Sequence, residues 1–183
     1  MGGGVHQHAA AVPWAEHGHA ARIGADLVEL RIDYVLRTVN LSRLVEERPT
    51  PVVITCRRPK DGGKWRGSEA DRIILLRTAV ATGVDYVDIE EDVADQIPRY
   101  GKTKRIISYH NLKETPENIE EIHASMLAKD PDIIKIATFA NSPKDNLRVL
   151  RLIRNSPVPT VAFCMGEFGA ISRIICRKFG SPF

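Results

Sequence analysis

The sequence predicts an α/β fold of the (β/α)8-barrel type, incomplete, with about six recognisable strands. Short apolar segments alternate with helical ones along the chain, which is typical of a parallel sheet covered by helices. One strand with its helix takes roughly 30 residues, which matches about 250 residues divided over the eight units of a barrel. The cluster Gly62-Gly63 lacks the spacing of a G-x-G-x-x-G or Walker phosphate loop, so a doubly wound sheet is disfavoured.

Residues 1–24 form a poorly defined N-terminal segment, and the predicted partial barrel runs from residue 25 to 183. Within the segment, residues 12–22 favour a helix that Gly24 closes. The segment also contains two His-x-His pairs, His6/His8 and His17/His19. Residues two apart do not share a helix face, so a helix surface or a frayed end is favoured over a metal site.

Six segments combine an apolar run with flanking turn residues and are predicted strands, at residues 25–33, 51–57, 84–90, 104–110, 132–138 and 158–165. Helices are predicted between and after them, at residues 41–48, 68–82, 116–129, 143–155 and 169–178. Two of these helices have a start signal, an N-cap residue followed by proline at the first helical position, in Thr115-Pro116 and Ser142-Pro143.

The composition indicates an ordinary globular protein, since 43% of the 183 residues are hydrophobic and 27% are charged. A net charge of +3 is too small to favour nucleic acid or a membrane surface as a partner. No apolar run reaches the ~18 residues of a membrane span, and no apolar signal core begins the chain. Three widely spaced cysteines, Cys56, Cys164 and Cys176, are typical of reduced, buried thiols. We therefore expect a cytoplasmic protein without a zinc site.

One lysine stands in the middle of the most apolar predicted strand. Because side chains alternate along a strand, Lys135 shares a face with Ile133 and Ala137. Burial disfavours the charged amine and can lower a lysine pKa by up to about 3–5 units, which leaves some neutral, nucleophilic amine near neutral pH. The alternative is a strand-end lysine whose amine reaches water while its stem stays buried.

Polar residues gather at the carboxyl ends of the other predicted strands, where barrels of this type place their chemistry. In the first strand Glu29, Arg31 and Asp33 alternate with aliphatic residues and so share one face. Charged groups on an inward face are costly unless they pair or bind something. The later strands end in or lead to a further set of polar residues: Arg57, Asp88, Glu90, His110 and, after the sixth strand, Ser172-Arg173. Their convergence at one end of the fold indicates a binding or catalytic site.

The residue types in this set have a shared chemical logic. A lysine amine attacks a ketone or aldehyde to form an iminium, which acidifies the neighbouring carbon. A histidine can remove that proton and deliver one to a departing hydroxyl. Arginines match a carboxylate with their planar donors. These groups indicate an anionic, hydroxylated carbonyl substrate and an elimination or an aldol-type cleavage.

The chain resembles the type I 3-dehydroquinate dehydratases of the shikimate pathway. The resemblance covers residues 24–183 and rests on ordered segments around Glu29-Leu30-Arg31, Thr55-Cys56-Arg57 with Gly62-Gly63, Ser108-Tyr109-His110, Ile134-Lys135-Ile136-Ala137 and Met165-Gly166-Glu167-Phe168-Gly169-Ala170-Ile171-Ser172-Arg173. It implies a hydro-lyase that converts 3-dehydroquinate to 3-dehydroshikimate through a Schiff base, without metal or organic cofactor. It also implies a homodimer for the full-length family.

The resemblance also implies roles for individual residues. Lys135 is expected to form the Schiff base and His110 to move the protons. Arg173 is expected to hold the substrate carboxylate, with Glu29, Arg31 and Arg57 contacting hydroxyls or ordering the pocket. Asp61 stands where the family usually has a glutamate that orients the histidine.

Some positions of the family pattern have no counterpart in this sequence. The first barrel strand, the last strand and the substrate-covering loop are not recognisable, so we expect an open barrel with weak or no activity on its own. Two other functions stay open: a class I aldolase-like lyase that uses the same lysine chemistry, and a truncated, non-catalytic remnant that serves as a binding module. Whether a shikimate dehydrogenase domain follows, as in some relatives, is also open.

Overall fold

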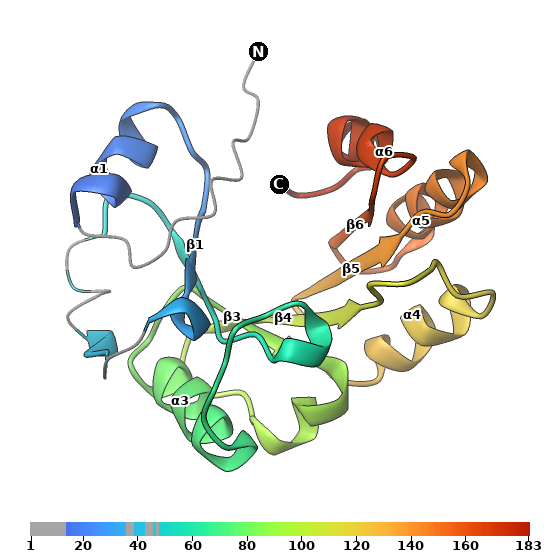
Figure 1. Cartoon of the computed structure of the whole chain (residues 1–183). Helices are drawn as coiled ribbons and strands as arrows, with labels where there is room; N and C mark the ends of the chain where they lie inside the picture. The colour runs from blue at the N-terminus through green and yellow to red at the C-terminus, as the bar shows by residue number, and fades with distance from the viewer. Residues whose placement is uncertain (1–13, 36–38, 43–45, 47) are drawn as a thin grey trace. The chain divides into compact units, whose positions relative to one another are not determined.

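The computed structural model describes the chain except for residues 1–13, 36–38, 43–45 and 47 (Figure 1). Six strands follow one another in the sheet order β1-β2-β3-β4-β5-β6. Their bounds are Val28–Arg31, Val52–Thr55, Tyr86–Glu90, Lys104–His110, Ile133–Phe139 and Thr160–Met165. The described α-helices are α1 (Trp14–Arg22), α3 (Glu69–Ala81), α4 (Ile119–Leu127), α5 (Pro143–Asn155) and α6 (Ala170–Ile175). This alternation confirms the predicted α/β class and the six predicted strands.

The chain divides into two compact units. The N-terminal unit comprises Met1–Asp88 and Gln96–Lys104, and the C-terminal unit comprises Ile89–Asp95 and Arg105–Phe183. No described helix is long and apolar enough to cross a membrane. The three cysteines, all within the described residues, are buried and form no disulfide, as predicted.

In the N-terminal unit, β2 pairs in parallel with β1 on one side and with β3 on the other. The register aligns Leu30 with Ile54 and Ile54 with Val87, and all three are buried. Helix α3 packs on β2 and buries Leu76 completely. Ser68 caps this helix by accepting a hydrogen bond from the Asp71 amide, which explains its start one residue later.

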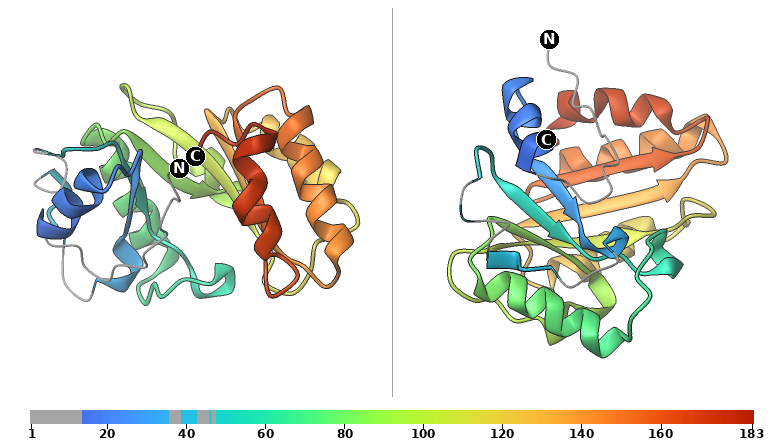
Figure 2. Two further views of the ribbon diagram at one scale, coloured as in Figure 1. Left: turned by 90° about the horizontal axis from the view of Figure 1, so that it is seen from above. Right: turned by 60° about the vertical axis from the view of Figure 1, so that its left-hand side comes forward.

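In the C-terminal unit, β5 pairs in parallel with β4 and β6. One face of this sheet is fully buried, at Ile107, Ile134, Ile136 and Ala162. Helix α4 packs on β5, whereas α5 and α6 pack on β6 and lie side by side (Figure 2). Helix α5 begins where the sequence predicts, because the Asp145 carboxylate accepts a hydrogen bond from the Ser142 amide (2.9 Å) and Pro143 takes the first helical position.

Two local predictions were wrong. The first strand ends at Arg31 rather than at residue 33, and Ile32–Tyr34 forms a 3-10 turn in which the Asp33 carboxylate binds Arg31. Helix α4 begins at Ile119 rather than at residue 116, because the Thr115 hydroxyl is bonded to the Phe139 carbonyl oxygen (3.1 Å) instead of capping the helix.

Two further predictions fall largely outside the described residues. The predicted helix at 41–48 includes residues 43–45 and 47, and the first His-x-His pair lies within residues 1–13. The predicted helix at 12–22 is present as α1 from residue 14 onward.

Candidate active site

The polar face of the N-terminal unit is built from β1, β2 and β3. The strand register aligns Arg31 with Thr55 and Thr55 with Asp88, so these side chains share one face with Glu29. The Thr55 hydroxyl donates to Glu29 Oε1 across 2.7 Å. Arg57 follows β2, and its Nη2 lies 2.8 Å from Asp88 Oδ2, with both side chains buried. Glu29, Arg31 and Arg57 therefore lie in the same unit, and each contacts a polar partner: Thr55, Asp33 and Asp88 respectively.

Arg31 is held by a two-point contact with Asp33. Its Nε and Nη2 donate to the two carboxylate oxygens of Asp33 across 2.8 and 2.7 Å. Burial alone would raise the pKa of Asp33, but Arg31 and the Lys64 amide hold that pKa below its usual value. Burial likewise opposes the charge of Arg31, and Asp33 more than compensates, so the pKa of Arg31 is raised. Both groups stay charged at neutral pH.

Asp61 lies in a 3-10 turn, Pro59–Asp61, in the loop that follows β2. Its Oδ2 accepts a hydrogen bond from Arg58 Nε across 2.7 Å, and the residue is half-buried. Gly62 follows with a positive φ of 83°, a conformation that favours glycine. A Cβ on Gly63 would lie 2.0 Å from the Arg57 carbonyl oxygen, so only glycine fits here. The Gly62-Gly63 pair therefore closes the turn against the Arg57 backbone.

The reactive groups of the C-terminal unit are Lys135 and His110. The register pairs His110 with Ala137, two residues beyond Lys135 on the neighbouring strand, so both side chains leave the same face of the sheet. One strand across and two residues along correspond to about 8 Å between their Cα atoms. Both residues are half-buried, whereas the opposite face carries the fully buried Ile134 and Ile136. The structure thus places an amine and an imidazole on one partly accessible surface.

Arg173 reaches the same face from α6. Phe163 is paired with Ala137 in the β5–β6 register and so shares the face of Lys135. The Arg173 Cζ lies 5.1 Å from the centroid of the Phe163 ring, within the range of a cation–π contact. Arg173 itself is exposed. Its guanidinium can therefore meet an anion over the β6 side of this surface.

Three residues of these groups had no role assigned from the sequence: Thr55, Phe163, and Asp88, which was counted only in the polar set at the strand ends. Thr55 and Asp88 bind the predicted Glu29 and Arg57, and Phe163 supports the predicted Arg173. The same two-residue alternation that selected Glu29 and Arg31 also marks Thr55 and Asp88 within their own strands. Phe163 had no comparable signal, because an aromatic residue in a strand is ordinarily part of the core.

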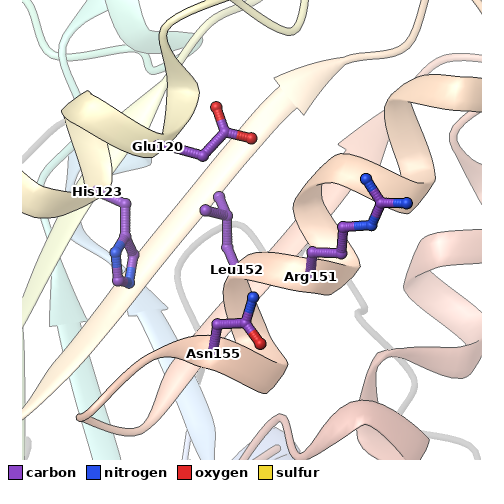
Figure 3. A pocket seen from close by; sticks show the side chains of 5 residues that line it. All are labelled: Glu120, His123, Arg151, Leu152 and Asn155. Atoms are coloured by element: carbon purple, nitrogen blue, oxygen red, sulfur yellow. The ribbon is translucent and has the colours of Figure 1, made fainter.

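A cavity of about 340 Å³ lies elsewhere in the C-terminal unit, between α4 and α5 (Figure 3). It is lined by Glu120, His123, Arg151, Leu152 and Asn155. None of the predicted site residues lines it. His123 is buried and its Nε2 lies 3.1 Å from the Ser156 hydroxyl; burial lowers the pKa of this imidazole.

Comparison with known families gives one consistent result. The model of the type I 3-dehydroquinase family matches residues 11–183. A 3-dehydroquinate dehydratase of Methanothermobacter thermautotrophicus is 41% identical over 171 residues, which cover 90% of this chain and 76% of the relative. A chloroplastic bifunctional 3-dehydroquinate dehydratase/shikimate dehydrogenase of Arabidopsis thaliana is 37% identical over 177 residues; this chain spans only 29% of that protein.

Solved structures agree with the sequence matches. The 3-dehydroquinate dehydratase of Geobacillus kaustophilus matches 91% of this chain and 74% of its own, with a TM-score of 0.78 and 25% identity. A type I enzyme of Clostridium difficile, crystallised with covalently modified comenic acid, matches 85% of this chain and 70% of its own, with a TM-score of 0.73 and 26% identity. The predicted barrel-type α/β fold is thus confirmed.

Proposed function

This chain belongs to the type I 3-dehydroquinate dehydratase family, and from that premise we propose that Lys135 and His110 are its reacting groups. The family is one of hydro-lyases of the shikimate pathway, which supplies chorismate and the aromatic amino acids. The observation that carries the proposal is the placement of Lys135 and His110 on one face of two neighbouring strands. One bound substrate can then form an imine with Lys135 and also be reached by His110, the base two residues farther along the adjacent strand.

The proposed reaction proceeds through a Schiff base. The neutral Lys135 amine adds to the ketone of 3-dehydroquinate and water leaves, which gives a protonated imine. The imine withdraws electrons, so His110 can take a proton from the adjacent carbon and leave an enamine. The enamine expels the neighbouring hydroxyl as water, with His110 donating its proton. Water then hydrolyses the imine, releases 3-dehydroshikimate and restores the amine. The protonated imine is the electron sink, so we propose that no metal or organic cofactor takes part.

We assign the remaining predicted residues to substrate binding. Arg173 is proposed to bind the substrate carboxylate, because it is exposed and its guanidinium is supported by Phe163. Arg31 and Arg57 each already face a carboxylate, Asp33 and Asp88 respectively. We therefore propose that these two arginines chiefly order the pocket, while Glu29 binds a substrate hydroxyl.

Asp61 is proposed to orient His110, in the role that a glutamate has in the family. Its carboxylate accepts a hydrogen bond from Arg58 Nε across 2.7 Å in this structure. We also propose that the chain is a cytoplasmic homodimer that binds neither nucleic acid nor membrane, and that residues 25–183 form its catalytic domain. The dehydrogenase activity in the name of the Arabidopsis protein is not part of the proposal, since this chain spans 29% of that protein.

Reductive trapping tests the proposed function. The chain is incubated with 3-dehydroquinate and borohydride, and the modified peptide is located by mass spectrometry, while dehydration is followed by the enone absorbance of the product. We expect the label on Lys135, its loss in Lys135→Ala, and its retention in Lys144→Ala, which removes an exposed lysine of α5. A label elsewhere would refute the assignment of Lys135. Labelling by sugar phosphates in place of 3-dehydroquinate would favour an aldolase-like lyase, and no label with either would favour a binding module.

A further inference from the structure

Ser172 forms a polar link between α6 and β6. Its side chain is completely buried, and its Oγ accepts a hydrogen bond from the Cys164 amide across 2.8 Å. The same hydroxyl donates to the Gly169 carbonyl oxygen across 2.7 Å. One hydroxyl therefore joins the end of β6, the loop after it and the first turn of α6.

The backbones approach each other closely at this link. A Cβ on Gly169 would lie 2.4 Å from the Met165 carbonyl oxygen, so the loop is in direct contact with the end of the strand. Helix α6 has only six residues, Ala170–Ile175, which is too short for a helix to be stable alone. Its orientation must come from tertiary contacts, and Ser172 supplies a directional one.

The residue after Ser172 is Arg173, the proposed carboxylate-binding residue. A long arginine side chain has many rotamers, and its reach over Phe163 depends on where α6 places its Cα. Misplacement of a binding group by about 1 Å can weaken catalysis by as much as about a hundredfold. The orientation of α6 on β6 therefore decides whether the guanidinium meets the substrate carboxylate.

We propose that Ser172 is a positioning residue that sets the place of Arg173 over the active face. This inference rests on the proposed function, because it assigns Ser172 to the carboxylate end of the same substrate. Ser172 therefore affects the affinity for the substrate and does not affect the chemistry at Lys135. The hydroxyl both accepts and donates here, and Thr retains both capacities whereas Ala has neither.

The first measurement needs no catalysis. A guanidinium over an aromatic ring shows an upfield ring-current shift of its Nε–H proton in NMR spectra, and Phe163→Leu identifies this signal for Arg173. We expect Ser172→Ala to abolish the shift and Ser172→Thr to keep it. Should Ser172→Ala fail to fold, Ser172→Cys, a weak hydrogen-bond partner of similar size, replaces it. An unchanged shift in the folded variant would overturn the inference whatever the enzyme does.

The second measurement is the 3-dehydroquinate concentration that half-saturates borohydride trapping at Lys135. We expect Ser172→Ala to raise it by about tenfold with the maximal labelling unchanged. In the Arg173→Ala background the same change should have no further effect, because the group that it positions is gone. Thr138→Val, which removes another fully buried hydroxyl, is the matched control and should leave the concentration unchanged.

These outcomes separate the two proposals. Absence of labelling in the wild-type chain would refute the proposed function. The NMR shift would still test whether Ser172 positions Arg173. Additive effects of Ser172→Ala and Arg173→Ala, with normal wild-type labelling, would overturn the positioning role alone.

Discussion

Arg57 and Asp88 form a buried ion pair, with Nη2 and Oδ2 2.8 Å apart and side-chain exposures of 3% and 0%. Arg57 lies two residues beyond the end of β2 and Asp88 lies in the middle of β3, and the β2–β3 register, in which Thr55 pairs with Asp88, brings them together. A buried charge is tolerated only while its partner is present. The pair therefore makes the polar face of this unit intolerant of change at either residue.

Asp88→Ala should lower the free energy of unfolding by about 3–5 kcal/mol, because it removes a carboxylate that lies 2.8 Å from the buried Arg57 guanidinium. Urea denaturation measures the difference. The matched control is Glu120→Ala, which removes the carboxylate of the more exposed Arg148–Glu120 pair (3.3 Å) and should cost less than about 1 kcal/mol. An equal decrease in the free energy of unfolding in the two variants would contradict a larger cost of breaking the buried pair. The double variant Arg57→Met/Asp88→Leu should recover part of the stability, since it removes both charges.

Gly63→Ala should destabilise the chain more than Gly83→Ala does. At Gly83 the φ is +75° and nothing lies within 4 Å of an added Cβ, so the cost is the left-handed conformation alone, about 1–2 kcal/mol. At Gly63 the added Cβ would meet the Arg57 backbone at 2.0 Å, and the strand end must shift. Thermal melting compares the two variants. A Gly63→Ala protein as stable as Gly83→Ala would show that the Arg57 backbone moves without cost.

The sequence alone predicted the elements whose signals are local. Helix α5 has the predicted bounds because Ser142, Pro143 and Asp145 specify its start within four residues. Lys135 lies on the face of Ala137, as the two-residue alternation predicts, whereas the place of His110 on that same face follows from the β4–β5 register. Ile32–Tyr34 could not be foreseen, since its turn is stabilised by Lys64, a residue distant in sequence. Contacts between strands, such as that of Arg57 with Asp88, depend on a register that no single segment contains.

His123 should make stability depend on pH. Burial lowers the pKa of this imidazole in the folded chain below its unfolded value of about 6.5. The neutral form is therefore favoured by folding, so its contribution is complete above about pH 6.5 and is lost as the pH falls toward the lowered pKa. Denaturation at several pH values should show this loss in the wild-type chain and a smaller one in His123→Gln. A slope in His123→Gln equal to that of the wild-type chain would disprove the role of His123.

His110→Ala should separate adduct formation from elimination. The Lys135 amine is untouched, so the borohydride label on Lys135 should persist in this variant. Removal of the proton and departure of the hydroxyl both need the imidazole, so turnover should fall about 10³-fold or more, which corresponds to about 4 kcal/mol of barrier. Enone absorbance measures turnover and mass spectrometry measures the label on the same samples.

The control is His123→Gln, which removes a histidine of α4 and should keep both the turnover and the label. Turnover in His110→Ala equal to that of the wild-type chain would show that another group moves the protons, whereas loss of the label as well would show that His110 already acts in imine formation.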